Sequence, residues 1–162
     1  MTFLHQLVHQ LVAALLALAP GQPAGASEVL HSWDDRRAAA WAAGDPAALR
    51  ALCEPGSAAG RADLAMLRAW RERGLRVEGL RMQLLELDVR RASDDRLELV
   101  VTDRLTGAVA TGPGVRLALP RDRATTRRVV LVRRAGEWRV AQSVEGARAV
   151  RTTSWTVRSR NE

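Results

Sequence analysis

The first half of the chain carries apolar residues at helical spacing. From Ser27 onward, Leu30, Trp33 and Trp41 fall on one side of a helix. Ser27 is a good N-cap residue, and Gly44 is a good C-terminal stop. The spacing therefore predicts a long first helix between these two residues.

Two shorter helices are predicted next. Asp45 and Pro46 combine an N-cap acceptor with a proline at the first helical position, which predicts a helix over 47–53. Helical spacing returns over about 61–73 and stops at Gly74.

After this stop the apolar residues alternate, as in strands that are buried on one face. The phase slips at Gly79 and at the Leu84-Leu85 pair, which predicts β-bulges in one long, bent strand. The Ala135-Gly136 pair separates the last two runs, as in a tight hairpin. The predicted strands cover 75–89, 96–105, 108–111, 115–119, 126–134 and 137–144. Helices followed by antiparallel strands predict an α+β domain, with three N-terminal helices packed on a curved, mostly antiparallel sheet.

The two ends of the chain differ from this domain, which we place at 27–146. Residues 1–26 contain no charged side chain, and an apolar run over 11–19 is followed by Pro, Gly and the small residues 24–26. This order is typical of a signal peptide cleaved after residue 26, and it predicts an exported or cell-envelope protein. An amphipathic leader helix, or the remainder of a longer anchor, is the alternative, and without a signal the protein would be cytoplasmic. We expect residues 147–162 to form a basic tail, either as an edge strand around Trp155 or frayed.

Charge is distributed unevenly along the chain. The formal net charge is +7, and all 25 basic residues are arginine, since the sequence contains no lysine. An alanine-rich chain without lysine or isoleucine is typical of a GC-rich genome, whatever the fold. Residues 27–104 nevertheless carry 13 Arg and 14 acidic residues, whereas residues 105–162 carry 12 Arg and 4 acidic residues. Only this local excess is a candidate for binding an anionic polymer or a lipid surface.

Two segments carry a resemblance to a known family. They are the step between the first helices at 42–49 (AAGDPAAL) and the final hairpin at 130–140 (VLVRRAGEWRV). Together they resemble the nuclear transport factor 2-like superfamily, which includes SnoaL-like cyclases and ketosteroid isomerases. The stretch from about 28 to 145 is similar to exported or membrane-tethered actinobacterial proteins of this class. The resemblance implies a cone-shaped α+β domain with a pocket between the sheet and the first helix, and a homodimer formed through the sheet.

Several kinds of chemistry lack the residues that they need. The resemblance implies a tyrosine hydroxyl for isomerase-type catalysis, and the chain has no tyrosine. After residue 26 there is one histidine, His31, which we expect to be exposed beside a solvated Asp34 and Asp35. The single cysteine, Cys53, excludes an internal disulfide and the common zinc patterns. We therefore expect no metal and no cofactor.

The candidate catalytic pair is Asp103 with Arg37. Asp103 shares the parity of the apolar positions in its strand, so it points either into the cone as a general base or toward a buried Arg37. The competing interpretation is a strand-end carboxylate that is solvated or paired with Arg104.

Two further groups are candidates for binding. The first could line an apolar pocket, although tryptophan at helical spacing is more often ordinary core. The second could bind anions, although its members are most simply the solvated face and ends of a strand. The pocket candidates are Trp33, Met66, Trp70 and Met82, and the anion-binding candidates are Arg127, Arg128, Arg133 and Arg134.

Our favoured hypothesis is an exported, non-enzymatic domain that binds a partner protein or a small ligand. The first alternative is a SnoaL-like isomerase or hydrolase with Asp103 as the base. The second is an electrostatic binder that uses the basic C-terminal third, with a weak contact to an anionic membrane. We do not expect nucleic acid as a partner.

Overall fold

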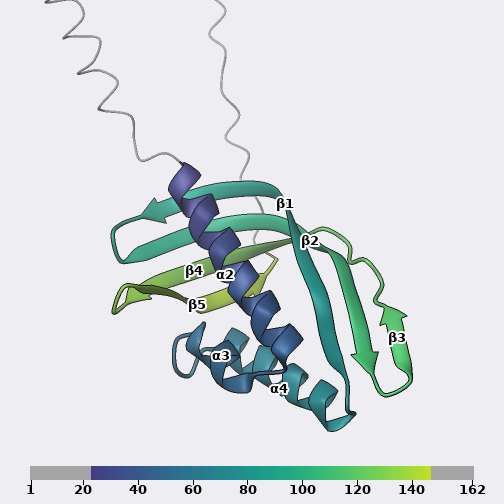
Figure 1. Ribbon diagram of the computed structural model, residues 1–162. Coiled ribbons are helices and arrows are strands. Elements are labelled where there is room, and N and C mark those ends of the chain that lie inside the picture. The colour runs from purple at the N-terminus through teal and green to yellow at the C-terminus, as the bar shows by residue number, and fades with distance from the viewer. Residues whose placement is uncertain (1–22, 147–162) are drawn as a thin grey trace, which may run out of the picture.

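In the part of the chain that the structure describes, three helices come first and a five-stranded sheet follows (Figure 1). The computed structural model describes residues 23–146. The helices are α2 (Pro23–Ala43), α3 (Pro46–Ala51) and α4 (Ala58–Glu72). The strands are β1 (Arg76–Ala92), β2 (Arg96–Gly112), β3 (Val115–Ala118), β4 (Thr125–Arg134) and β5 (Glu137–Glu145). This arrangement confirms the predicted α+β class.

The start of α3 follows the predicted capping chemistry. Asp45 Oδ1 accepts hydrogen bonds from the amides of Ala47 at 2.8 Å and Ala48 at 3.1 Å, and Pro46 occupies the first turn. Both donors would otherwise have no partner at the helix N-terminus.

The other two helices start earlier than predicted. Helix α4 begins after Ser57, whose Oγ accepts from the Gly60 amide at 3.1 Å, so the predicted start at residue 61 was wrong. Helix α2 begins at Pro23, and Ser27 lies inside it rather than at its N-cap. Ala26 is buried in the core, so packing extends α2 beyond the predicted cap. The predicted cleavage site after Ala26 therefore falls within α2 and stays a prediction, as does the leader over 1–26. Residues 1–22 of that leader and the predicted tail over 147–162 lie outside the described residues.

The sheet has the strand order β1-β2-β4-β5, with antiparallel pairing throughout, and β3 pairs with the far end of β2. The β1–β2 register shifts between Glu78 and Arg81 and between Leu84 and Glu86, which confirms the two predicted bulges. Strand β2 runs unbroken where two strands were predicted, because Gly107 pairs with Arg81 and continues the ladder.

The hairpin between β4 and β5 also follows the prediction. Its two turn residues, Ala135 and Gly136, have φ values of 50° and 85°. Positive φ at both positions is typical of the two-residue turn that joins twisted antiparallel strands.

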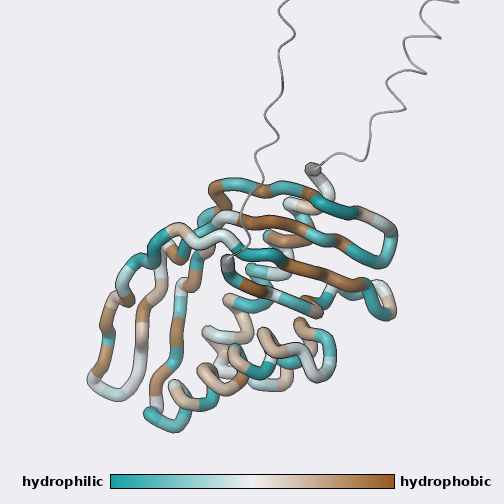
Figure 2. The backbone as a smooth tube through the Cα atoms, turned by 180° about the vertical axis from the view of Figure 1, so that it is seen from behind, coloured by the Kyte–Doolittle hydropathy of each residue, from teal (hydrophilic) through white to brown (hydrophobic). Residues whose placement is uncertain are grey.

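The core lies between the helices and one face of the sheet. Helix α2 crosses that face, and α3 and α4 lie beside one end of it (Figure 1). From behind, hydrophobic residues concentrate in the middle of the central strands (Figure 2). Trp33 anchors α2 by donating from Nε1 to the carbonyl of Leu52 at 2.8 Å. No helix among residues 23–146 combines the length and the apolar character needed to cross a bilayer.

Candidate functional site

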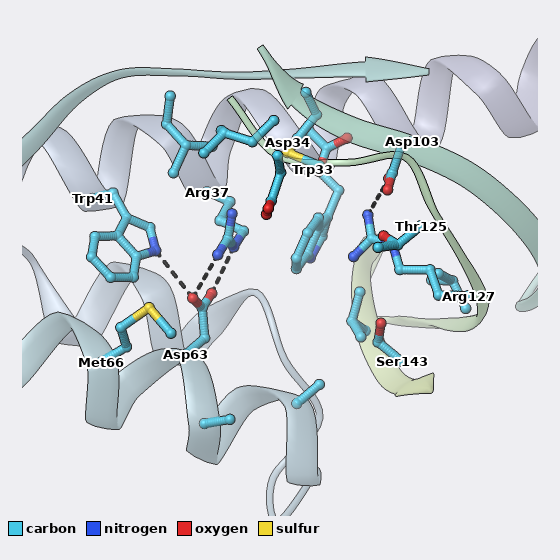
Figure 3. A pocket seen from close by; sticks show the side chains of 18 of the residues that line it. Trp33, Asp34, Arg37, Trp41, Asp63, Met66, Asp103, Thr125, Arg127 and Ser143 are labelled. Atoms are coloured by element: carbon cyan, nitrogen blue, oxygen red, sulfur yellow. Dashed lines mark hydrogen bonds and ion pairs between the residues drawn. The ribbon is translucent and has the colours of Figure 1, made fainter. Parts of the chain in front are cut away.

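A cavity of about 530 Å³ lies between the sheet, α2 and α4 (Figure 3). Its walls include all four predicted pocket residues: Trp33 from α2, Met66 and Trp70 from α4, and Met82 from β1. Trp33 is buried and also belongs to the core, whereas Met66 is 56% exposed. The four residues therefore share one cavity, and their role in binding stays a prediction.

Arg37 forms the first ion pair of the pocket with Asp63 of α4. The guanidinium donates from Nε and Nη2 to the two carboxylate oxygens, each at 2.7 Å. Trp41 Nε1 also donates to Asp63 Oδ1 at 3.2 Å. Burial lowers the pKa of the Arg37 guanidinium, but its hydrogen bonds and attraction to Asp63 outweigh this effect and hold the pKa above its usual value. The prediction that Arg37 pairs with Asp103 was therefore wrong.

A close helix contact brings Asp63 into this position. A Cβ added at Gly60 would lie 2.7 Å from Cys53 Cβ, so glycine allows α4 to approach the segment after α3. Asp63 follows Gly60 by three residues, about one turn along the same helix face. Asp63 could have been found in the sequence, because it lies within the predicted helix over 61–73, four residues before Leu67 and therefore on the buried face.

Asp103 forms the second ion pair, with Arg127 of β4. Asp103 Oδ2 lies 2.5 Å from Arg127 Nη2, and the residue is 2% exposed. The expectation of a solvated carboxylate was wrong, as was a pairing with Arg104, which donates to Gln83 Oε1 at 2.8 Å. Among the described residues, the buried Nε of Arg127 has no hydrogen-bond partner.

The four arginines of the anion-binding hypothesis do not form one patch. Arg127 lines the pocket, whereas its neighbour Arg128 donates to Glu98 at 2.7 Å. Arg133 donates to the Gly136 carbonyl at 3.1 Å, and Arg134 lies 3.5 Å from Glu54. Successive side chains of a strand point to opposite faces, and this alternation separates the set.

Asp34 is the pocket residue that the sequence analysis placed wrongly. It comes from α2 and lies between the two ion pairs, beside Trp33 (Figure 3). Within residues 23–146, no hydrogen bond or ion pair is formed by its side chain. Burial raises the pKa of Asp34 to about 6, and the opposing attraction of Arg127 and Arg37 does not cancel this effect.

Its location could have been found from helical spacing. Asp34 follows Leu30 by four residues and precedes Arg37 by three, so all three lie on one face of α2. The expectation that a carboxylate near a helix start is solvated was the error.

The remaining polar side chains do not add a nucleophile or a metal site. Cys53 lies in the wall, where burial raises the pKa of its thiol and keeps it neutral. His31 is exposed, as predicted. In the described part of the chain, no three metal-binding side chains gather at one point.

The fold has relatives among solved structures. The intermembrane-space region of the chloroplast protein ARC6 is 14% identical with a TM-score of 0.51, over 78% of this chain and 98% of that one. Aln2 from a Streptomyces species is 19% identical with a TM-score of 0.51, over 78% of this chain and 93% of that one. The chain has the nuclear transport factor 2-like fold. No family model matches the sequence, and no curated protein matches it.

The nuclear transport factor 2-like fold accounts for the location of the pocket, between the sheet and the first helix of the described chain. At the identities just given, the likeness is one of fold. Function has to be argued from the side chains in the pocket.

Proposed function

We propose that the chain is an exported, non-enzymatic binding domain whose pocket takes a small ligand. The observation that carries this proposal is the cavity of about 530 Å³, with aromatic and aliphatic walls around a few buried charged groups. Cavities of this size and composition are typical of small-molecule sites, because the apolar walls supply affinity and the polar groups fix orientation.

The charged groups favour binding over catalysis. Arg37 is neutralised by Asp63, and Asp103 is neutralised by Arg127, so neither pair supplies a free base. Each carboxylate would have to leave its guanidinium before it could face a substrate. The pairing with Arg127 therefore disfavours Asp103 as a catalytic base.

Filling the cavity tests ligand binding. Ala62 lies in the wall on the exposed side of α4, so Ala62→Trp would place an indole in the cavity without replacing a buried residue. Ala65→Trp, on an exposed position of the same helix outside the cavity lining, is the matched control. We expect naphthylmethanol to bind the wild type and Ala65→Trp, and to bind Ala62→Trp at least about tenfold more weakly. Equal binding to all three proteins would contradict the proposal.

Asp34 supports a second candidate function, an acid–base enzyme acting on a lactone, steroid or polyketide-like substrate. Its carboxyl has no partner among the described residues, and its pKa of about 6 suits a general base near neutral pH. Turnover should then rise with pH through about 6 and disappear in Asp34→Asn. Turnover that survives Asp34→Asn but disappears in Asp103→Asn would favour Asp103 as the base instead.

A further inference from the structure

The pocket holds one more carboxylate than its arginines can neutralise. Asp63 pairs with Arg37, and Asp103 pairs with Arg127. Asp34 is the third carboxylate of this inner group, and no arginine, lysine or histidine among the described residues forms an ion pair with it. A bound anion would face this extra negative charge, unless it displaced a carboxylate from one of the arginines.

The mouth of the pocket adds to the negative charge. Asp122 and Glu145 belong to the lining and are both exposed, and no basic residue other than Arg37 and Arg127 belongs to it. The lining therefore holds five acidic and two basic side chains, although the whole chain has a formal net charge of +7. The pocket has the opposite charge to the rest of the molecule.

The environment of Asp34 leaves an electrostatic deficit that a cation would remove. A half-buried carboxylate without a partner has lost part of its hydration and gained no hydrogen bond in return. Trp33 lies beside it, and Trp41 already has the guanidinium of Arg37 at 5.9 Å from its ring centroid. Tryptophan faces attract cations, and they also pack against apolar ligand bodies.

We propose that the pocket selects a small apolar amine, whose ammonium group pairs with Asp34 and whose apolar body packs against the tryptophan and methionine walls. This inference rests on the proposed small-ligand function and names its ligand class. The ammonium supplies the ion pair and hydrogen bonds that Asp34 lacks, while both arginine pairs stay intact.

Proton linkage follows from the same contact. The free pocket has Asp34 with a pKa of about 6, and a bound ammonium lowers that pKa, because it stabilises the ionised carboxylate. The amine therefore binds best above about pH 6, and its affinity falls by about tenfold between about pH 7 and pH 5 as Asp34 becomes protonated. The charged groups that act on Asp34 are Arg37 and His31 of α2, Asp103 of β2 and Arg127 of β4, with Asp63, Asp122 and Glu145 also in or beside the pocket.

Three probes that share one naphthalene body separate charge from shape: naphthylmethylamine, naphthylmethanol and naphthoate. Calorimetric titration of the full chain should show the amine binding at least about tenfold more tightly than the alcohol at about pH 7, and naphthoate binding most weakly. Asp34→Asn should remove the preference for the amine and leave the alcohol nearly unchanged. Asp35→Asn, on an exposed position of the same helix, should keep the preference.

The outcomes separate this inference from the function on which it rests. If the alcohol or naphthoate binds most tightly, and Ala62→Trp weakens that binding, the pocket binds ligands but does not select cations. If the amine preference persists in Asp34→Asn, or if amine binding persists in Ala62→Trp, the assigned contact is wrong. If no probe binds, the proposed function fails as well.

Discussion

Arg127 and Arg128 are neighbours on β4, yet they lie on opposite faces of the sheet and in different surroundings. The Arg127 side chain is 21% exposed and pairs with Asp103, whose side chain is 3% exposed. The Arg128 side chain is 51% exposed and pairs with Glu98. The hydrogen bonds from Arg128 and Arg96 lower the pKa of Glu98, whose side chain is 14% exposed. The same residue type therefore lines the pocket on one face and forms a more exposed ion pair on the other.

Charge alone does not show which of the four arginines of β4 belongs to the pocket, because Arg127 and Arg128 are neighbours in the sequence. Burial and the ion-pair partner identify Arg127 as the pocket residue. The same two criteria also pick out Asp34, since it is half-buried and has no ion-pair partner among the described residues.

Breaking the buried pair should have the largest effect on stability. Arg127→Ala leaves the Asp103 carboxylate buried without its counter-ion, which should lower the free energy of unfolding by about 3 kcal/mol. Urea unfolding followed by tryptophan fluorescence measures this loss. Arg127→Ala combined with Asp103→Ala should recover part of it, and a double variant no more stable than the single one would contradict the assigned pairing.

Neutralising Asp34 should have a smaller effect of the opposite sign. The pKa of its carboxyl is raised from 3.8 to about 6 in the folded chain, so the folded state holds this proton more tightly than the unfolded state. Stability should therefore fall as pH rises from about 4 to about 6. At about pH 7, Asp34→Asn should raise the free energy of unfolding by about 1–2 kcal/mol, because it removes the buried charge.

The control for this change is Asp35→Asn, which alters an exposed carboxylate of the same helix. Urea unfolding at several pH values should show the wild type and Asp35→Asn losing stability together across that range. The Asp34→Asn variant should lose less stability than either protein over the same pH range. Parallel curves for all three proteins would show that Asp34 does not titrate in the pocket.

Removing the outer arginine should have the smallest effect. Arg128→Ala breaks an ion pair whose arginine is half exposed, and such pairs contribute little to stability. Arg96 still donates to Glu98 at 3.0 Å in this variant, so the carboxylate keeps a partner. The urea midpoint should stay close to that of the wild type, far from that of Arg127→Ala. Equal losses in the two variants would remove the distinction between the two faces of the sheet.

Much of the fold could be predicted from local chemistry. Asp45-Pro46, the phase slips near Gly79 and Leu84, and the Ala135-Gly136 turn each determine backbone geometry over a few residues, and the structure confirms them. The start of α2 could not be found in this way, because the burial of Ala26 depends on packing against distant segments rather than on a cap.

The site could be predicted only in part. Strand parity put Asp103 on the side of Leu99 and Val101, but left a solvated carboxylate as the competing interpretation. Its partner depends on the β2–β4 register, in which Asp103 lies opposite Thr125 and diagonal to Arg127. That register comes from tertiary pairing. Asp34 is a different case. Its helical spacing relative to Arg37 was enough to place it in the pocket, but the carboxylate was wrongly expected to be solvated.

The ionisation of Asp34 is the most direct test of the account, because both the charge excess of the pocket and its cation preference depend on that carboxyl. Carbon-detected NMR titration of the aspartate carboxyl groups, with Asp34→Asn identifying the signal, measures its pKa in the free protein. The account predicts a midpoint of about 6, which falls when naphthylmethylamine is added. A midpoint near the ordinary value of 3.8, unchanged by the amine, would contradict it.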